Sequence, residues 1–103
     1  MDNFKVIYKI LKTLEKSMDY EEFDTKLISS EALDITRERW NAIMKMLLGN
    51  GYIEGAEAVK YIGAAEIKLN WPEITLKGLE YLSENSMMKK MAALAKGVAE
   101  IVM

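Results

Sequence analysis

The stretch that decides the fold is residues 36–75, TRERWNAIMKMLLGNGYIEGAEAVKYIGAAEIKLNWPEIT. Its first third has apolar residues at three- and four-residue spacing, which predicts an amphipathic helix over residues 36–48 with Thr36 as its cap. The buried face of this helix is expected to consist of Trp40, Ile43, Met44 and Leu47. Glycine and asparagine at residues 49–51 then end the helix, because both residues tolerate the left-handed conformation.

After the glycines, the sequence changes to a period of two. Ile67, Leu69 and Trp71 alternate with polar residues, as in a half-buried strand, and Pro72 is expected to close that strand. Residues 52–59 are the best candidate for a partner strand, joined through residues 60–65. The stretch therefore predicts a helix followed directly by an antiparallel hairpin.

The residues before this stretch predict two more helices. The first covers about residues 2–17, with Phe4, Ile7, Leu11, Leu14 and Met18 on its apolar face and Lys5, Lys9, Lys12 and Lys16 opposite. We interpret this lysine row as a solvated surface, with contact to nucleic-acid phosphate as the alternative. A second, short helix is expected from a capping box at Asp19 and Glu22 to about residue 29 or 30. A short strand at residues 33–35 could add to the hairpin.

Two helices are expected after the hairpin. Thr75 can cap the first, with Ile74 and Leu79 as a hydrophobic staple. A break at residues 84–86 precedes the second, whose apolar stripe is Met87, Met91, Leu94, Val98 and Ile101. We therefore expect a domain over residues 1–85, and a C-terminal amphipathic helix over residues 86–103 that packs on it or mediates dimerisation.

The predicted order is three helices, a hairpin and two helices, which is the order of a winged helix. We expect an α+β, mainly helical, winged helix-turn-helix fold with a two- or three-stranded wing sheet and an extra C-terminal helix. The residues after the third helix and in the fourth also resemble one family; they are Gly51, Tyr52, Ile53, Ile74, Thr75, Gly78, Tyr81, Leu82, Glu84 and Asn85. This family is the YjcQ-like winged-helix proteins, small bacterial proteins often encoded in phage or prophage regions. The resemblance implies the same fold over nearly the whole chain.

Composition limits the chemistry that the chain can perform. It has no cysteine and no histidine, so the thiolate nucleophile, the commonest general base and the usual zinc ligands are missing. We expect no enzyme activity, no metal and no cofactor. No apolar run is long enough to span a membrane, and we expect a cytoplasmic protein.

The fold suggests DNA binding as the first function. The third helix of such proteins commonly enters the major groove while the wing reaches the backbone. The candidate contact residues are Arg37, Arg39, Asn41, Lys45, Lys60 and Lys68, with Asn41 suited to reading adenine. The net charge of −2 and the wing residues Glu54, Glu57 and Glu66 oppose this reading, because DNA-binding domains usually carry basic excess.

A protein-interaction module is the alternative function. The methionine-rich stripe of residues 87–101 could pair with a second copy as a coiled-coil seam, or bind a host or phage protein. The same stripe could instead pack onto the first helix as core. The sequence therefore leaves open whether the partner is duplex DNA, a second copy of the chain or another protein.

Overall fold

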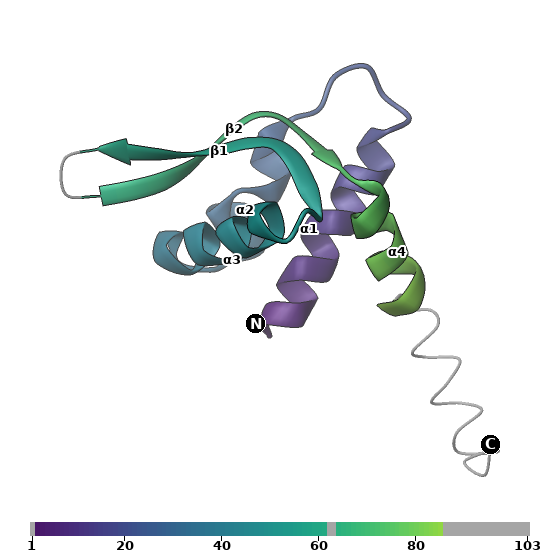
Figure 1. The fold of residues 1–103 in the computed structure, drawn as a ribbon, viewed down its shortest axis with the longest axis horizontal. Helices are drawn as coiled ribbons and strands as arrows, with labels where there is room; N and C mark the ends of the chain where they lie inside the picture. The colour runs from purple at the N-terminus through teal and green to yellow at the C-terminus, as the bar shows by residue number, and fades with distance from the viewer. Residues whose placement is uncertain (1, 62–63, 86–103) are drawn as a thin grey trace, which may run out of the picture.

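The computed structural model describes residues 2–61 and 64–85 (Figure 1). The elements in chain order are α1 (Asn3–Ser17), the 3-10 helix η1 (Thr25–Ile28), α2 (Ser30–Leu33), α3 (Arg37–Gly49), β1 (Ile53–Tyr61), β2 (Ala64–Ile74) and α4 (Leu76–Asn85). The fold is α+β and mainly helical, with the winged-helix order that the sequence predicts. The expected last helix, with its stripe of Met87, Met91, Leu94, Val98 and Ile101, lies outside the described residues.

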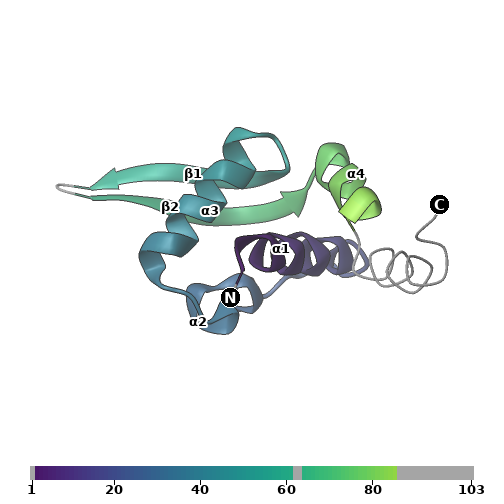
Figure 2. The ribbon, with the colours of Figure 1, turned by 90° about the horizontal axis from the view of Figure 1, so that it is seen from below.

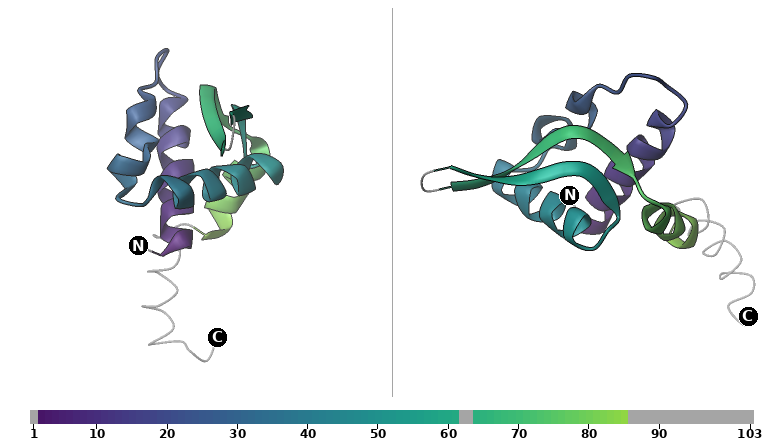
Figure 3. Two further views of the ribbon diagram at one scale, coloured as in Figure 1. Left: turned by 90° about the vertical axis from the view of Figure 1, so that its left-hand side faces the viewer. Right: turned by 45° about the horizontal axis from the view of Figure 1, so that its top comes forward.

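One hydrophobic core joins α1, α3, the hairpin and α4. The axes of α1 and α3 cross, and the hairpin covers α3 and projects beyond it on the side opposite α4 (Figures 2 and 3). The predicted apolar face of α3 is confirmed, because Trp40, Ile43, Met44 and Leu47 are all buried. The indole Nε1 of Trp40 also donates to the Ile28 carbonyl at 2.7 Å, which fixes α3 against η1.

The buried face of α1 differs from the prediction. Val6 and Ile10 are fully buried beside Leu11 and Leu14, whereas Phe4 and Met18 are exposed. Phe4 lies in the first turn and Met18 caps the last, so both lie at the ends of the helix. The centre of α1 alone supplies the core.

The segment between α1 and α3 was predicted wrongly. Two short elements replace the single helix, and their caps are Asp24, which accepts from the Lys26 N–H, and Ser29, which accepts from the Ala32 N–H. The expected strand at residues 33–35 is absent as well. There Leu33 ends α2 and Asp34 adopts the left-handed conformation at φ 54°.

The sheet has two antiparallel strands, and its register changes at a bulge. Glu54 pairs with Glu73 and Ala56 with Leu69, so Gly55 alone lies opposite residues 70–72. Gly55 has φ 79°, and a Cβ at this position would overlap the Trp71 carbonyl. The sequence suggested that Pro72 ends the strand, but β2 continues to Ile74. The proline is tolerated inside the strand because it lies at a bulge, where its missing N–H leaves no ladder hydrogen bond unmade.

Thr75 connects the end of the hairpin to α4. Its hydroxyl donates to the Gly51 carbonyl and accepts from the Gly78 N–H at 3.1 Å, so the predicted cap is confirmed. Gly78 packs so closely on the Tyr52 carbonyl that a Cβ would overlap it. Helix α4 then packs against α1 and β2 and covers this side of the core.

Candidate functional site

Four of the six residues expected to contact DNA belong to α3, and three of these four are exposed. These three are Arg37, Arg39 and Lys45, and Glu38 is exposed as well, but Arg37 and Arg39 lie on opposite flanks of the helix because two residues turn by about 200°. The Arg37 guanidinium lies 3.7 Å from the Glu66 carboxylate of β2 and 5.0 Å from the centre of the Trp40 ring. The ion pair thus connects Arg37 to the hairpin, while the cation–π contact with Trp40 lies within α3.

Asn41 does not lie on the open face where the sequence placed it. It is half-buried, and its Oδ1 accepts a hydrogen bond from the Ile67 N–H at 3.0 Å. Among the described residues, β2 pairs with a strand on one side only, so this amide would otherwise lack a ladder partner. Asn41 therefore connects α3 to the edge of the sheet, and its carbonyl oxygen is occupied.

The structure brings only some of the candidate cations together. Arg37 and Lys68 line one surface hollow beside Trp40, while Arg39 lines another formed by residues 34–36. Lys45 and Lys60 line neither. Lys60 is exposed. Lys68 lies directly opposite Glu57 in the strand pairing, and the negative charge of this glutamate reduces the positive potential around Lys68. The six residues do not form one basic surface.

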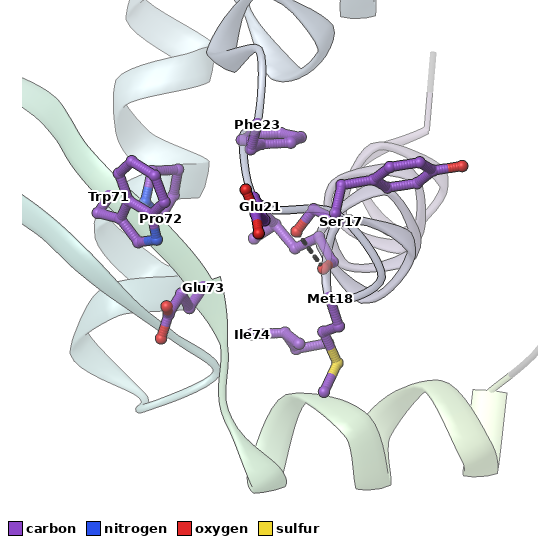
Figure 4. A pocket seen from close by; sticks show the side chains of 10 residues that line it. Ser17, Met18, Glu21, Phe23, Trp71, Pro72, Glu73 and Ile74 are labelled. Carbon is purple, nitrogen blue, oxygen red and sulfur yellow. Dashed lines mark hydrogen bonds between the residues drawn. The ribbon is translucent and has the colours of Figure 1, made fainter.

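A second site, which the sequence did not predict, lies between the end of α1 and β2 (Figure 4). We call it the aromatic pocket, and it has a volume of about 290 Å³. Its lining consists of Leu14, Ser17, Met18, Tyr20, Glu21, Phe23, Trp71, Pro72, Glu73 and Ile74. Figure 4 shows Trp71 and Pro72 on the β2 side, facing Met18 and Phe23 on the other.

The bulge at Gly55 makes the β2 wall of this pocket. Before the bulge, Ile67 and Leu69 point toward the core, whereas after it Pro72 and Ile74 are the buried residues. The alternation of β2 thus changes phase at the bulge. Trp71, which the sequence placed on the buried face, is therefore 59% exposed.

The opposite wall comes from the chain that leaves α1. Ser17 donates to the Leu14 carbonyl at 2.6 Å in the last turn, and the next residues turn away from the helix. Met18 is 63% exposed and Tyr20 is 73% exposed, while Phe23 is half-buried. Large apolar residues within a charged connection are the sequence signal that could have indicated this site.

The aromatic pocket has a carboxylate on each of its two walls. Glu21 and Glu73 line it, and Glu54 lies directly opposite Glu73 in the strand pairing. Like charges in directly opposed positions repel each other. In the part of the chain that the structure describes, none of these three carboxylates forms an ion pair. The rim is therefore acidic, and a bound cation would relieve its repulsion.

The groups with shifted pKa values lie outside this pocket. A hydrogen bond to the Glu15 carboxylate raises the pKa of Lys12. Hydrogen bonding to its own backbone N–H lowers the pKa of Glu31 at the start of α2. Burial raises the pKa of Tyr81, and the neighbouring Tyr52 adds to this effect. Each shift has a structural cause.

Within residues 2–61 and 64–85, no three potential ligand side chains are close enough to hold a metal ion. The helices in the same ranges are too short or too polar for any of them to cross a membrane.

Comparison with known proteins identifies a family. Neither the curated proteins nor the solved structures include a match to this chain. The family model described as YjcQ protein matches residues 8–101, which is most of the sequence, and the chain therefore belongs to the YjcQ family.

Proposed function

We propose that this protein is a non-catalytic winged-helix module that binds another protein through the aromatic pocket. The bound segment has one large apolar side chain for the pocket and neighbouring lysine or arginine residues for the rim. The observation that carries this proposal is the exposure of Met18, Tyr20 and Trp71 around one hollow that carboxylates border.

The size of the pocket favours a side chain over a cofactor. Sites for small molecules usually have volumes of about 300–1,000 Å³, so a pocket of about 290 Å³ is at the lower limit. Tryptophan and tyrosine are enriched among the residues that contribute most to protein interfaces. Trp71 and Tyr20 still have much of their surface left to bury.

The charge of the rim sets the chemistry of the partner. Glu21, Glu54 and Glu73 have no cationic neighbour paired with them among the described residues. Lysine or arginine on a partner would form exposed ion pairs, each contributing about 0.2–1 kcal/mol. Such pairs contribute mainly to orientation and association rate, while the apolar side chain contributes most of the affinity.

Selection from a random peptide library tests this proposal. Peptides that bind the full chain are expected to share an aromatic or large aliphatic residue next to lysine or arginine. Trp71→Ala should abolish their binding, and Glu21→Lys with Glu73→Lys should weaken it about tenfold or more. Leu27→Ala is the matched control, because Leu27 is similarly exposed but lies in η1, outside the pocket. Peptides that bind all variants equally would refute the proposal.

DNA binding by α3 is the second candidate function, in a regulator encoded in a phage or prophage region. It is favoured by Arg37, Arg39 and Lys45, because α3 has these three exposed basic residues and a single acidic residue, Glu38. The hairpin weakens the candidate because it has four glutamates and two lysines. Such a surface should have little sequence-independent affinity for phosphate.

Selection from random duplex DNA at low and moderate salt tests the second candidate. Enrichment of a motif that is lost on Arg39→Ala with Lys45→Ala would support it. Asn41 is unsuitable as a probe, because its substitution also removes a contact within the fold. If neither salt concentration enriches a motif, the DNA candidate is excluded.

A further inference from the structure

We infer that residues 86–103 of this chain, its C-terminal segment, bind in the aromatic pocket of the same molecule and compete with its partner. The competition rests on the proposed function, because it requires that the pocket binds a partner segment. The contact between the segment and the pocket is a separate claim, and it can be measured separately.

Charge complementarity is the first argument. Residues 1–85 contain 11 basic and 15 acidic residues, whereas the C-terminal segment contains three lysines and one glutamate. The lysines are Lys89, Lys90 and Lys96. A segment with net positive charge therefore follows a body with net negative charge, and the glutamates of the pocket rim are unpaired within the described residues.

The apolar residues of the segment are the second argument. Met91 and Leu94 lie between the lysine pair and Lys96. This is an apolar centre with cations on both sides, which is the chemistry that the pocket and its rim require. Methionine also adapts to irregular apolar surfaces, such as one formed by Trp71, Pro72 and Phe23.

The length of the segment is the third argument. The pocket includes Ile74, which lies just before α4, and the ten residues of α4 span about 15 Å. Binding in the pocket requires residues 86–90 to be extended, unlike the helix that the sequence predicts there; at about 3.3–3.6 Å per residue, these five residues can return over this distance. Met91 is then the first apolar residue beyond that return. A short tether also gives a high effective concentration, so weak contacts are sufficient.

Disulfide trapping in the full chain tests the contact. The chain has no cysteine, so introduced cysteines are the only thiols present. Met18→Cys with Met91→Cys should form an intramolecular disulfide under mild oxidation, because a disulfide requires Cα atoms within about 7 Å. Met46→Cys with Met91→Cys is the matched control, since Met46 is an exposed methionine in α3 that does not line the pocket. The pocket pair should react about tenfold faster or more.

Charge reversal provides a second measurement. Lys89→Glu with Lys90→Glu should slow trapping of the pocket pair several-fold, and adding Glu21→Lys with Glu73→Lys should restore it. Equal rates for the pocket and control pairs would overturn the inference. A covalent dimer as the only fast product would also overturn it, because the occupant would then be a second copy. Circular dichroism and thermal unfolding confirm that each variant is folded.

Peptide binding separates this inference from the proposed function. If the segment competes, Met91→Glu with Leu94→Glu should tighten binding of a selected peptide about tenfold. Peptide binding to the wild type without fast trapping would remove the inference and leave the proposed function. Fast trapping without peptide binding, even in the Met91→Glu, Leu94→Glu variant, would remove the proposed function and the competition, but not the contact.

Discussion

Asn41 connects α3 to the edge of β2 through the hydrogen bond that its Oδ1 accepts from the Ile67 N–H. Asn41→Ala leaves this amide without an acceptor in a partly buried position. An unsatisfied buried donor costs about 1–3 kcal/mol. We therefore expect the variant to lose at least about 1 kcal/mol of unfolding free energy, measured by urea denaturation.

Lys45→Ala is the control in the same helix. Lys45 is exposed and forms no hydrogen bond or ion pair among the described residues, so its substitution should change stability by less than about 0.5 kcal/mol. Equal stability of the two variants would show that the Asn41 contact contributes nothing to the fold.

Gly55 provides the second residue-scale prediction. Gly55→Ala places a Cβ against the Trp71 carbonyl at a φ of 79°, where alanine is also strained. We expect a loss of about 2 kcal/mol or more in thermal or urea unfolding. Gly49→Ala is the matched control, because its Cβ would meet open space at the end of α3. A Gly55→Ala variant as stable as Gly49→Ala would contradict the observed bulge.

At the scale of elements, Thr75 determines how α4 follows the hairpin. Its hydroxyl caps α4 at the Gly78 N–H and also donates to the Gly51 carbonyl. Loss of a helix cap costs about 0.5–2 kcal/mol. Thr75→Ala should therefore lower the unfolding free energy by about 1–2 kcal/mol, near the top of this range, because it removes two hydrogen bonds.

The conservative variant at this position is the control. Thr75→Ser keeps the hydroxyl and should recover most of the lost stability. If Thr75→Ser were as unstable as Thr75→Ala, the methyl group rather than the hydroxyl would be responsible. Urea denaturation of the two variants, monitored by circular dichroism, distinguishes these outcomes.

At the scale of the whole molecule, charge and apolar surface contribute to binding in different ways. The carboxylates at the pocket rim are exposed or near the surface, so salt should screen their attraction for a basic peptide. We expect the affinity of a selected peptide to fall about threefold to tenfold between 0.05 and 0.5 M salt, without being abolished. Fluorescence anisotropy of a labelled peptide measures this change, and an uncharged analogue with the same apolar residue is the control. Equal salt dependence of the two peptides would exclude a role for the rim.

The elements with long, regular patterns could be predicted from the sequence. The period of α3, the alternation at Ile67 and Leu69 and the cap at Thr75 are local signals, and the structure confirms each of them. The short connection between α1 and α3 could not be predicted in the same way. Several capping residues compete there, and packing of Ile28 and Leu33 into the core selects Asp24 and Ser29.

The sequence by itself determined the order from α3 through the hairpin to α4, the family and the apolar face of α3, because these depend on residue spacing and type along the chain. Only the tertiary structure decided the role of Asn41, because its hydrogen-bond partner Ile67 is 26 residues away. Only the tertiary structure also decided where the aromatic pocket forms, since the walls of this pocket come from the end of α1 and from β2 beyond the bulge. Periodicity identifies which residues share a face of one element, whereas a site between elements depends on how those elements pack.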